Sequence, residues 1–161
     1  MNEIKIDRQI WMCSNLDVDH YRNGDPIPQV RGKKKWENLK TGAWCYYDND
    51  PENGGKFGKL YNWYAVNDPR GLAPEGWRVP SEEELDEFLD AAETDDFNAL
   101  FGGCRDCYGD FYNIGLNAYF WSSTTLSSLS AWYMTLVSSN SFTYLSFNYY
   151  AYGFSVRCIK D

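Results

Sequence analysis

The residues with the clearest chemical potential are Cys104 and Cys107, which are separated by two residues, as in half a zinc site or a redox-active pair. A closed zinc site needs four ligands, yet no second such pair is present and the single histidine, His20, lies far away in the sequence. A thioredoxin-like pair is expected where a strand meets a helix, which makes a redox role equally weak here. We therefore interpret both cysteines as ordinary members of a variable stretch, and we predict neither a metal nor a cofactor.

Residues 82–84 are all glutamate, and paired carboxylates can act as a catalytic acid and base. A structural explanation is simpler, because Ser81 can cap a helix whose third residue, Glu84, reaches back to the cap amide, and because an acidic first turn complements the helix dipole. Apolar residues then recur at helical spacing and predict one buried stripe over residues 82–92, formed by Leu85, Phe88, Leu89 and Ala92. No serine, histidine and acid constellation is recognisable, so we predict that the protein is not an enzyme.

The oxygen-rich segment 48–55 has the sequence Asp-Asn-Asp-Pro-Glu-Asn-Gly-Gly, which is similar in composition to a calcium-binding loop. It lacks the regular alternation of ligands and the distal bidentate glutamate of an EF-hand. Its density of turn-forming residues instead predicts a tight surface turn and no metal site.

The composition of the chain changes near its middle. Residues 104–152 contain no lysine, glutamate or glutamine, whereas the preceding 103 residues hold 18 of them. This segment is filled mainly by Ser, Tyr, Leu, Asn, Phe, Thr, Ala and Asp. Tyrosine and phenylalanine offer large rigid contact area, and serine and asparagine offer adaptable hydrogen bonds, as in antibody loops. The composition therefore predicts a binding surface.

The overall composition disfavours several classes of partner. The net charge of -8 argues against nucleic acid and anionic membrane surfaces, because both require clustered basic side chains. No apolar stretch approaches the length of a membrane span. The first residues contain no apolar signal region, so we expect that export is absent or that a leader was removed. The length predicts one domain, 1–161, and the odd number of cysteines leaves at least one free thiol.

Local patterns in the first half predict short elements joined by loops. Residues 10–13 form an apolar run that is typical of a strand, and residues 14–25 form a polar loop. Pro26 and Pro28 hold the next stretch extended, and residues 34–39 predict one or two helical turns. Residues 60–66 are apolar on both alternating faces, which predicts burial but does not distinguish a helix from a strand.

After Gly102 and Gly103 the helical signals end. Residues 119–121 and 131–133 are typical of short strands, and residues 154–159 predict a final strand with alternating faces. The C-terminal half is therefore predicted to be β-rich with long loops. Within it we assign six side chains to the core, namely Phe111, Ile114, Tyr119, Phe120, Leu136 and Phe154.

Five runs together carry a resemblance that covers nearly the whole chain. They lie at residues 10–12 (Ile-Trp-Met), 58–66 (Gly-Lys-Leu-Tyr-Asn-Trp-Tyr-Ala-Val), 76–81 (Gly-Trp-Arg-Val-Pro-Ser), 120–124 (Phe-Trp-Ser-Ser-Thr) and 153–158 (Gly-Phe-Ser-Val-Arg-Cys). These runs resemble the Fibrobacter succinogenes major paralogous (FISUMP) domain. That family is similar to the formylglycine-generating-enzyme branch of the C-type lectin fold. The resemblance implies an α+β fold with a twisted antiparallel β-core, flanking helices and neighbouring N- and C-terminal strands.

Some members of this fold are variable proteins of diversity-generating retroelements, in which reverse transcription miscopies template adenines and rewrites a ligand-binding face. An asparagine codon rewritten in this way yields Tyr, Ser, Phe, Leu, Thr, Ala or Asp, among others, but never Lys, Glu, Gln or Trp. The resemblance thus implies that residues 104–152 are a diversified region and that Trp121 and Trp132 are fixed core residues. Met134 requires a mutated arginine codon, and the absence of His and Pro from the region is not explained.

The function implied is a receptor-like module that binds an unknown protein or glycan ligand on a cell or phage surface. We expect it to act as a monomer on a cell surface or virion, without nucleic acid and without membrane insertion. Two alternatives are a formylglycine-generating-type enzyme, whose cysteine motif Cys104 and Cys107 do not match, and a fixed-specificity carbohydrate-binding lectin, whose Glu-Pro-Asn and Trp-Asn-Asp signatures are missing. The candidate ligand-binding residues are Asp106, Tyr108, Asp110, Tyr112, Leu126, Ser128, Leu129, Tyr133, Thr135, Val137, Phe142, Tyr144, Leu145, Phe147, Tyr149, Tyr150 and Tyr152.

Overall fold

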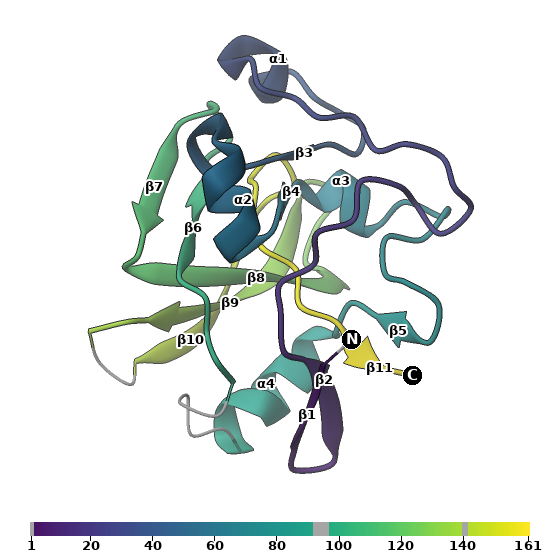
Figure 1. The fold of residues 1–161 in the computed structure, drawn as a ribbon, viewed down its shortest axis with the longest axis vertical. Coiled ribbons are helices and arrows are strands. Elements are labelled where there is room, and N and C mark those ends of the chain that lie inside the picture. Colours follow the sequence, from purple (N-terminus) through teal and green to yellow (C-terminus); the bar gives the residue numbers. More distant parts are fainter. Residues whose placement is uncertain (1, 92–96, 140–141) are drawn as a thin grey trace.

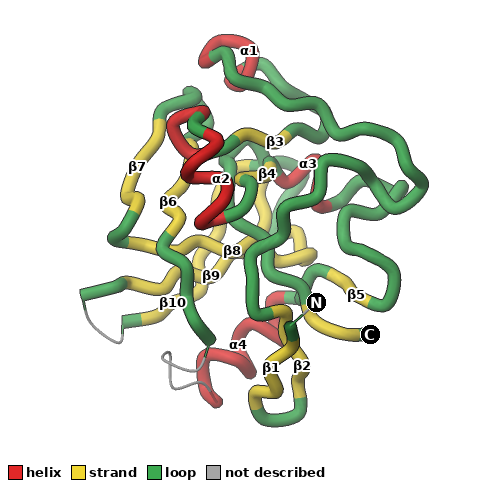
Figure 2. The backbone as a smooth tube through the Cα atoms, viewed as in Figure 1, coloured by secondary structure: helices red, strands yellow, loops and turns green. Residues whose placement is uncertain are grey.

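The structure is a computed structural model that describes residues 2–91, 97–139 and 142–161 of the chain. These residues form a sheet-rich α+β fold, which confirms the predicted class (Figure 1, Figure 2). A four-stranded sheet of order β1-β2-β11-β5 contains Glu3–Ile6, Gln9–Met12, Ile159–Lys160 and Trp77–Arg78. A five-stranded sheet of order β10-β9-β8-β6-β7 contains Thr143–Tyr149, Ser130–Val137, Asn117–Thr125, Gly102–Arg105 and Phe111–Ile114. A two-stranded sheet pairs β3 (Trp44–Cys45) with β4 (Leu60–Tyr61).

The helices are short and lie around the sheets (Figure 2). They are α1 (Lys33–Glu37), the 3-10 helix η1 (Tyr47–Asn49), α2 (Pro51–Phe57), α3 (Trp63–Val66) and α4 (Glu82–Ala91). None of the helices in the described part of the chain has the length and apolar character needed to cross a bilayer.

The five-stranded sheet is bent between two groups of strands. β8, β9 and β10 form an antiparallel meander in which Thr135 lies opposite both Tyr119 and Tyr144. β6 joins β8 in parallel through the single pair Gly103 and Ala118, and β7 then pairs with β6. β6 and β7 run steeply to the other three strands in Figure 1, so the sheet curls at this junction.

One face of this sheet, called the α4 face here, packs against α4. Alternate residues of β8, β9 and β10 on this face are Ala118, Phe120, Met134, Leu136 and Leu145. They share a core cluster with Leu85 and Phe88 of α4, and with Trp11 and Phe97. The apolar stripe of α4 therefore has the buried role that its spacing predicts.

The opposite face, called the Phe154 face, packs against the C-terminal part of the chain. The ring centroids of Tyr119, Trp121 and Tyr133 lie 5.2, 4.5 and 4.6 Å from that of Phe154. Tyr119, Phe120, Leu136 and Phe154 are buried as predicted, whereas Phe111 and Ile114 are only half-buried and pack against a smaller cluster around Trp36.

Residues 153–159 run between all three sheets. Gly153 exchanges two backbone hydrogen bonds with Arg105 of β6, and Phe154 pairs with Tyr61 of β4. Further along, the Ser155 carbonyl accepts from the Trp121 amide of β8, and the Cys158 carbonyl accepts from the Met12 amide of β2. Every residue of the segment is buried, and the predicted strand over residues 154–159 is wrong except at Ile159, where β11 begins. Regular pairing is confined to Ile159–Lys160, where β11 lies beside β2, and this pairing confirms the expected neighbouring of the terminal strands.

Arg157 carries a charge into this buried segment. Its guanidinium donates to the Asn15 Oδ1 atom at 2.7 Å and to the Phe97 carbonyl at 2.6 Å, and it lies 4.3 Å from the centre of the Phe97 ring. Burial lowers the pKa of Arg157 to about 10, so the guanidinium stays charged at neutral pH. Arg157 thereby links the loop that precedes β6 to the buried segment 153–159.

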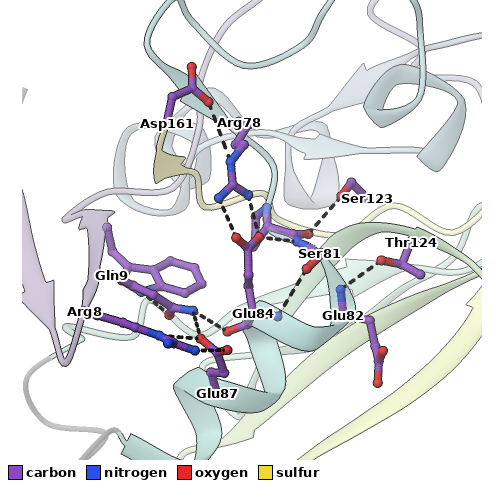
Figure 3. A network of polar contacts seen from close by, with 12 residues as sticks. Arg8, Gln9, Arg78, Ser81, Glu82, Glu84, Glu87, Ser123, Thr124 and Asp161 are labelled. Atoms are coloured by element: carbon purple, nitrogen blue, oxygen red, sulfur yellow. Dashed lines mark hydrogen bonds and ion pairs between the residues drawn. The ribbon is translucent and has the colours of Figure 1, made fainter.

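The capping box that starts α4 forms as predicted (Figure 3). The Ser81 hydroxyl accepts from the Glu84 amide at 3.2 Å, and the Glu84 carboxylate accepts from the Ser81 amide at 2.8 Å. Arg78 binds the same carboxylate, and the Thr124 hydroxyl accepts from the Glu82 amide at 2.9 Å. These bonds supply partners for backbone groups that every helix start leaves unsatisfied. The predicted end of the stripe, Ala92, lies outside the described residues.

Other local predictions had mixed outcomes. The early strand, the polar loop and the helical turns are confirmed as β2, the segment after it and α1. The predicted tight turn at residues 48–55 is wrong, because Asp50 caps α2 by accepting from the Glu52 amide at 2.9 Å while Pro51 starts the helix. Residues 60–66 divide into β4 and α3 at Asn62, whose buried side chain caps α3. Strands β8 and β9 are longer, and the loop between them shorter, than predicted.

We expect three of the five thiols to influence the pH dependence of stability. Burial raises the pKa of Cys45, Cys104 and Cys158 to about 12, from 9.0 for a free thiol. The unfolded state releases these protons first, so the free energy of unfolding should hold below pH 9 and fall as the pH rises toward 12. Urea unfolding at pH 8 and 10.5 should show a drop that is about 2 kcal/mol smaller in Cys158→Ala than in the parent. An identical drop in both proteins would contradict the burial of this thiol.

Candidate functional site

Large apolar side chains that remain exposed are confined to one part of the described chain. Nine are exposed, and all lie between residues 108 and 149. They are Tyr108, Tyr112, Leu116, Leu126, Leu129, Phe142, Tyr144, Phe147 and Tyr149. All except Leu116 belong to the candidate ligand-binding set. Exposed apolar side chains gathered in one region are typical of an interaction surface.

The two ends of this region are fastened together at its base. Arg105 and Gly153 exchange backbone hydrogen bonds of 3.0 and 2.7 Å. The Arg105 side chain is 1% exposed and donates to the carbonyls of Gly109, Val30 and Arg31 at 3.1, 2.8 and 2.8 Å. Residues 106–152 therefore form one long segment whose two ends are joined by the bonds between Arg105 and Gly153. We call this segment the excursion and the joined ends the closure.

Trp36 lies against this closure and leaves no room for a side chain at Gly153. A Cβ atom there would stand 3.0 Å from the Trp36 ring and 3.3 Å from the Arg105 Cβ. The Trp36 indole also donates to the Ala151 carbonyl at 2.9 Å, and the Arg105 guanidinium lies 4.7 Å from the ring centre. The closure is thus built from buried residues on both sides of the excursion.

The turn at residues 106–110 uses its two acidic residues internally. The Asp106 carboxylate accepts from the amides of Tyr108 and Asp110, both at 2.9 Å. Asp110 forms an exposed ion pair with Lys33 at 2.6 Å. Asp106 and Asp110 therefore shape the turn, and the side chain that it presents to solvent is Tyr108, which is 62% exposed.

Four candidate residues meet around a depression of about 260 Å³. Tyr108, Leu129, Tyr149 and Tyr150 line it together with Glu37, Tyr64, Cys107 and Ala151. A second depression, of about 240 Å³, also contains Tyr64 and Tyr150 and extends toward Lys40 and Arg70. Tyr64 was not predicted as a site residue, because residues 60–66 form an apolar run that indicates burial, although Tyr64 is half-buried. We call these two adjoining hollows the tyrosine depression.

Tyr150 lines both hollows. Its ring stacks on Trp63 with centroids 4.4 Å apart, and its edge meets Tyr64 at 5.5 Å. Its hydroxyl lies 2.8 Å from the Thr125 Oγ1 atom and donates to the Ser127 carbonyl at 2.7 Å. Tyr150 therefore holds the turn between β8 and β9, on which Leu126, Ser128 and Leu129 are exposed.

Other candidate residues are divided by the sheet. Directly opposed residues share a face, so the register places Tyr144 on the Phe154 face and Leu145 and Phe147 on the α4 face. Tyr144 lies 5.7 Å from Phe142, and Phe147 lies 5.8 Å from Trp132, measured between ring centroids. Val137 and Tyr152 are half-buried, and Tyr112 is exposed on β7. The structure therefore gathers only part of the candidate set around the tyrosine depression.

Three assignments from the sequence require correction. Thr135 is completely buried and Tyr133 is 7% exposed, so neither side chain is placed to contact a ligand. Both lie on the Phe154 face of β9. The sequence pattern does not reveal that β9 is an inner strand of the sheet, with Met134 and Leu136 buried on its other face as well. Trp132, expected in the core, is half-exposed and packs on Phe147.

The Cys104 and Cys107 thiols are held in their protonated form. Burial raises the pKa of Cys107, and it raises that of Cys104 to about 12. Both groups therefore remain protonated at neutral pH, whereas nucleophilic and redox-active cysteines need a stabilised thiolate. Within the described ranges, no three His, Cys, Asp or Glu side chains are grouped so that they could hold a metal ion.

Comparison with known families identifies the buried part of the domain that supports this surface, which we call the frame. The model of the Fibrobacter succinogenes major domain matches residues 4–96 and, in an overlapping second match, residues 86–160. The chain belongs to this family. The resemblance seen in the sequence is thereby confirmed. No curated protein and no solved structure gave a significant match.

Most side chains of the family-like runs of this FISUMP domain lie in the frame, although half-buried Tyr64, from residues 58–66, lines the tyrosine depression. Their aromatic residues Trp11, Trp63, Trp77, Trp121 and Phe154 are all buried. Trp63 and Trp121 also donate from their indole nitrogens to backbone carbonyls, at 2.8 Å in both cases. The frame and the exposed aromatic residues are thus separate sets.

We expect the closure of the FISUMP domain to depend on the guanidinium of Arg105. Arg105→Lys should lower the free energy of unfolding by about 2 kcal/mol, because one ammonium group cannot replace contacts to three carbonyls. The amides of Gly109 and Asp110 should also exchange their hydrogens faster. Urea unfolding and hydrogen exchange would measure both effects. Lys33→Ala is the control, since its exposed ion pair holds the same turn, and it should change stability much less. Equal effects of the two substitutions would contradict the role of Arg105.

Proposed function

We propose that this FISUMP domain is a non-enzymatic, receptor-like module that binds a protein or glycan ligand through residues 104–152. The observation that carries the proposal is that every exposed large apolar side chain in the described residues lies in this region. Such side chains lose unfavourable contact with water when a partner covers them. The rigid tyrosines and phenylalanines among them lose little conformational entropy on binding.

The centre of the proposed binding surface is the tyrosine depression. Tyr108, Leu129 and Tyr149 surround it with exposed fractions of 62, 57 and 59%. Tyr150, which lines the depression with them, is fixed by stacking and by its hydroxyl contacts, so this part of the surface is ordered before a ligand arrives. Preorganisation of this kind reduces the entropic cost of association.

We propose that the fold is that of a C-type lectin domain of the formylglycine-generating-enzyme type, and that a retroelement diversified residues 104–152. Trp121 and Met134, which asparagine codons cannot yield by adenine mutagenesis, are fully buried, whereas the exposed side chains are of types that such codons can yield. The closure at Arg105 and Gly153 supports the same region, because it fastens both ends of residues 106–152 at one buried point. Half-exposed Trp132 would be a fixed residue at the margin of the diversified surface.

Binding is better supported than catalysis of the formylglycine-generating type. The protonated state of the Cys104 and Cys107 thiols at neutral pH provides no nucleophile. We propose that the module acts as a monomer on a cell surface or virion, where a variable ligand on another cell or phage surface is accessible.

The proposal predicts a second copy of the coding sequence nearby in the genome. Sequencing the neighbouring DNA should reveal a near-copy of the codons for residues 104–152 that differs mainly at adenines and adjoins a reverse-transcriptase gene. At the positions of Trp121 and Met134, the near-copy should not carry an asparagine codon. A neighbourhood that lacks both the copy and the transcriptase would contradict diversification.

The proposal also predicts that truncation of the tyrosine depression removes binding. The protein would be screened against a printed glycan array and a displayed library of random 12-residue peptides, and retained ligands would be titrated by calorimetry. The combined variant Tyr108→Ala, Leu129→Ala, Tyr149→Ala should weaken binding at least a hundred-fold, because truncating a central contact residue costs on the order of 2 kcal/mol. Leu116→Ala removes a similarly exposed side chain away from the depression and should leave affinity nearly unchanged. Unaltered affinity in the triple variant would contradict the site.

A further inference from the structure

β10 forms an open edge of the five-stranded sheet. Among the described residues, no strand lies beyond it in the sheet order, and it lies outermost in the meander in Figure 1. The Phe142 carbonyl accepts from the Val137 amide at 3.2 Å, and the Tyr150 amide donates to the Leu129 carbonyl at 2.9 Å. Even-numbered residues of β10 therefore direct their backbone groups at β9, because bonding alternates along an antiparallel pair.

The odd-numbered residues of β10 direct their backbone groups away from the sheet. Thr143, Leu145 and Phe147 each present one amide and one carbonyl on this side. The row ends at Tyr149, whose amide donates to the Asn148 side chain and whose carbonyl accepts from the Tyr152 amide. Six backbone groups in a row thus form a template for one further strand.

This edge lacks the features that normally prevent strand addition. Edge strands are usually short or carry charged residues or proline. β1, an edge of the four-stranded sheet, carries Glu3 and Lys5, β5 is two residues long, and β7 has four residues. β10 has seven residues, and no charged residue or proline occurs anywhere in residues 111–156. An edge that is long, uncharged and aromatic is predicted to bind another strand.

The charge beside this edge is acidic. α4 packs against β10 and contains Glu82, Glu83, Asp86 and Asp90 but no basic residue. Figure 3 shows Arg78 bound to Glu84 and Arg8 bound to Glu87, which leaves the other four without an ion pair among the described residues. A strand that adds to β10 would therefore be attracted by this helix if its side chains were basic and repelled if they were acidic.

We propose that β10 binds an extended segment of a protein ligand as a sixth strand of the sheet, and that this segment carries basic side chains on the α4 face. The inference rests on the proposed function and narrows its ligand class from protein or glycan to polypeptide. Backbone hydrogen bonds supply affinity in this mode, and the side chains that alternate along the two strands supply specificity.

The acidic helix also distinguishes a foreign segment from a second copy of this chain. Antiparallel pairing of two β10 strands about a two-fold axis would place both α4 helices on the same side of the joined sheet. Each helix contributes unpaired carboxylates, so the two copies would repel one another there. A basic segment gains attraction at the same position.

Strand addition suits a surface whose side chains are changed by diversification. The six outward backbone groups are present whatever side chains other than proline occupy β10, so a new variant without proline retains an anchorage for an extended ligand. Phe147 on the α4 face and Tyr144 on the Phe154 face would contact alternate residues of the added strand. Diversification would then change which segment is preferred and not whether a segment is bound.

The experiment selects binders to the full-length protein from the displayed library of random 12-residue peptides. Enriched peptides should carry Lys or Arg at alternate positions. Each peptide would be resynthesised in two forms, one with N-methyl groups on its odd-numbered amides and one with N-methyl groups on its even-numbered amides. We call these two forms the two phases, and both would be titrated by calorimetry. Methylation in the phase that faces β10 should weaken binding at least ten-fold relative to the other phase, because it removes the donors that pair with the edge.

A matched pair of protein variants tests the same contact from the other side. Phe147→Pro removes both the ring and the outward amide, whereas Phe147→Ala removes only the ring. Proline is tolerated on an edge strand where the amide does not bond within the sheet. Phe147→Pro should therefore bind the selected peptides at least ten-fold more weakly than Phe147→Ala, while circular dichroism shows both variants folded.

The remaining outcomes separate this inference from the proposed function. Equal binding of the two methylated phases, or a β10-mediated dimer in sedimentation, would overturn strand addition. If the selected ligands lose affinity in the tyrosine-depression variant but show no phase effect, or if only glycans bind, the proposed function stands and the inference falls. If neither peptides nor glycans are retained, both fall.

Discussion

The paired backbone hydrogen bonds of Arg105 and Gly153 are the constraint on which the rest of the structure depends. They close the excursion of residues 106–152 at one point, where Trp36 packs against both residues. From the same point, residues 153–159 continue through the interior and contact all three sheets. The frame is therefore held by buried backbone bonds and family-like aromatic residues, and the exposed side chains of the excursion contribute little to it.

The place of a strand in the sheet sets a second limit, because it divides a chemically uniform segment between two environments. Tyr133 and Tyr144 lie on the same Phe154 face, yet Tyr133 on the inner strand β9 is buried and Tyr144 on the edge strand β10 is exposed. Exposed aromatic residues collect where the sheet ends, around the tyrosine depression and along β10. Binding through the depression and binding through the edge of β10 use adjacent surfaces, which Tyr149 connects.

Local signals were predictable where the structure depends on local bonds. The capping box of α4 and its apolar stripe were readily predicted because Ser81, Glu84, Leu85 and Phe88 interact within or directly beneath one helix. The helix start at Asp50 and Pro51 was equally local but was hidden by a pair of glycines that favours a turn. The prediction of a strand over residues 154–159 was wrong for a different reason. Their alternation of residue types is real, yet sheets lie on both sides, and that arrangement comes from distant parts of the chain.

The sequence by itself determined the family, the class of fold, the unusual composition of residues 104–152 and most of the exposed aromatic side chains. Only the tertiary structure decided that Thr135 and Tyr133 are buried, that Tyr64 joins the tyrosine depression, and that β10 is an open edge. The physical reason is that composition and periodicity act along the chain, whereas faces and edges depend on which strands pair and in what register. A shift of one residue in that register would move every side chain of the strand to the opposite face of the sheet.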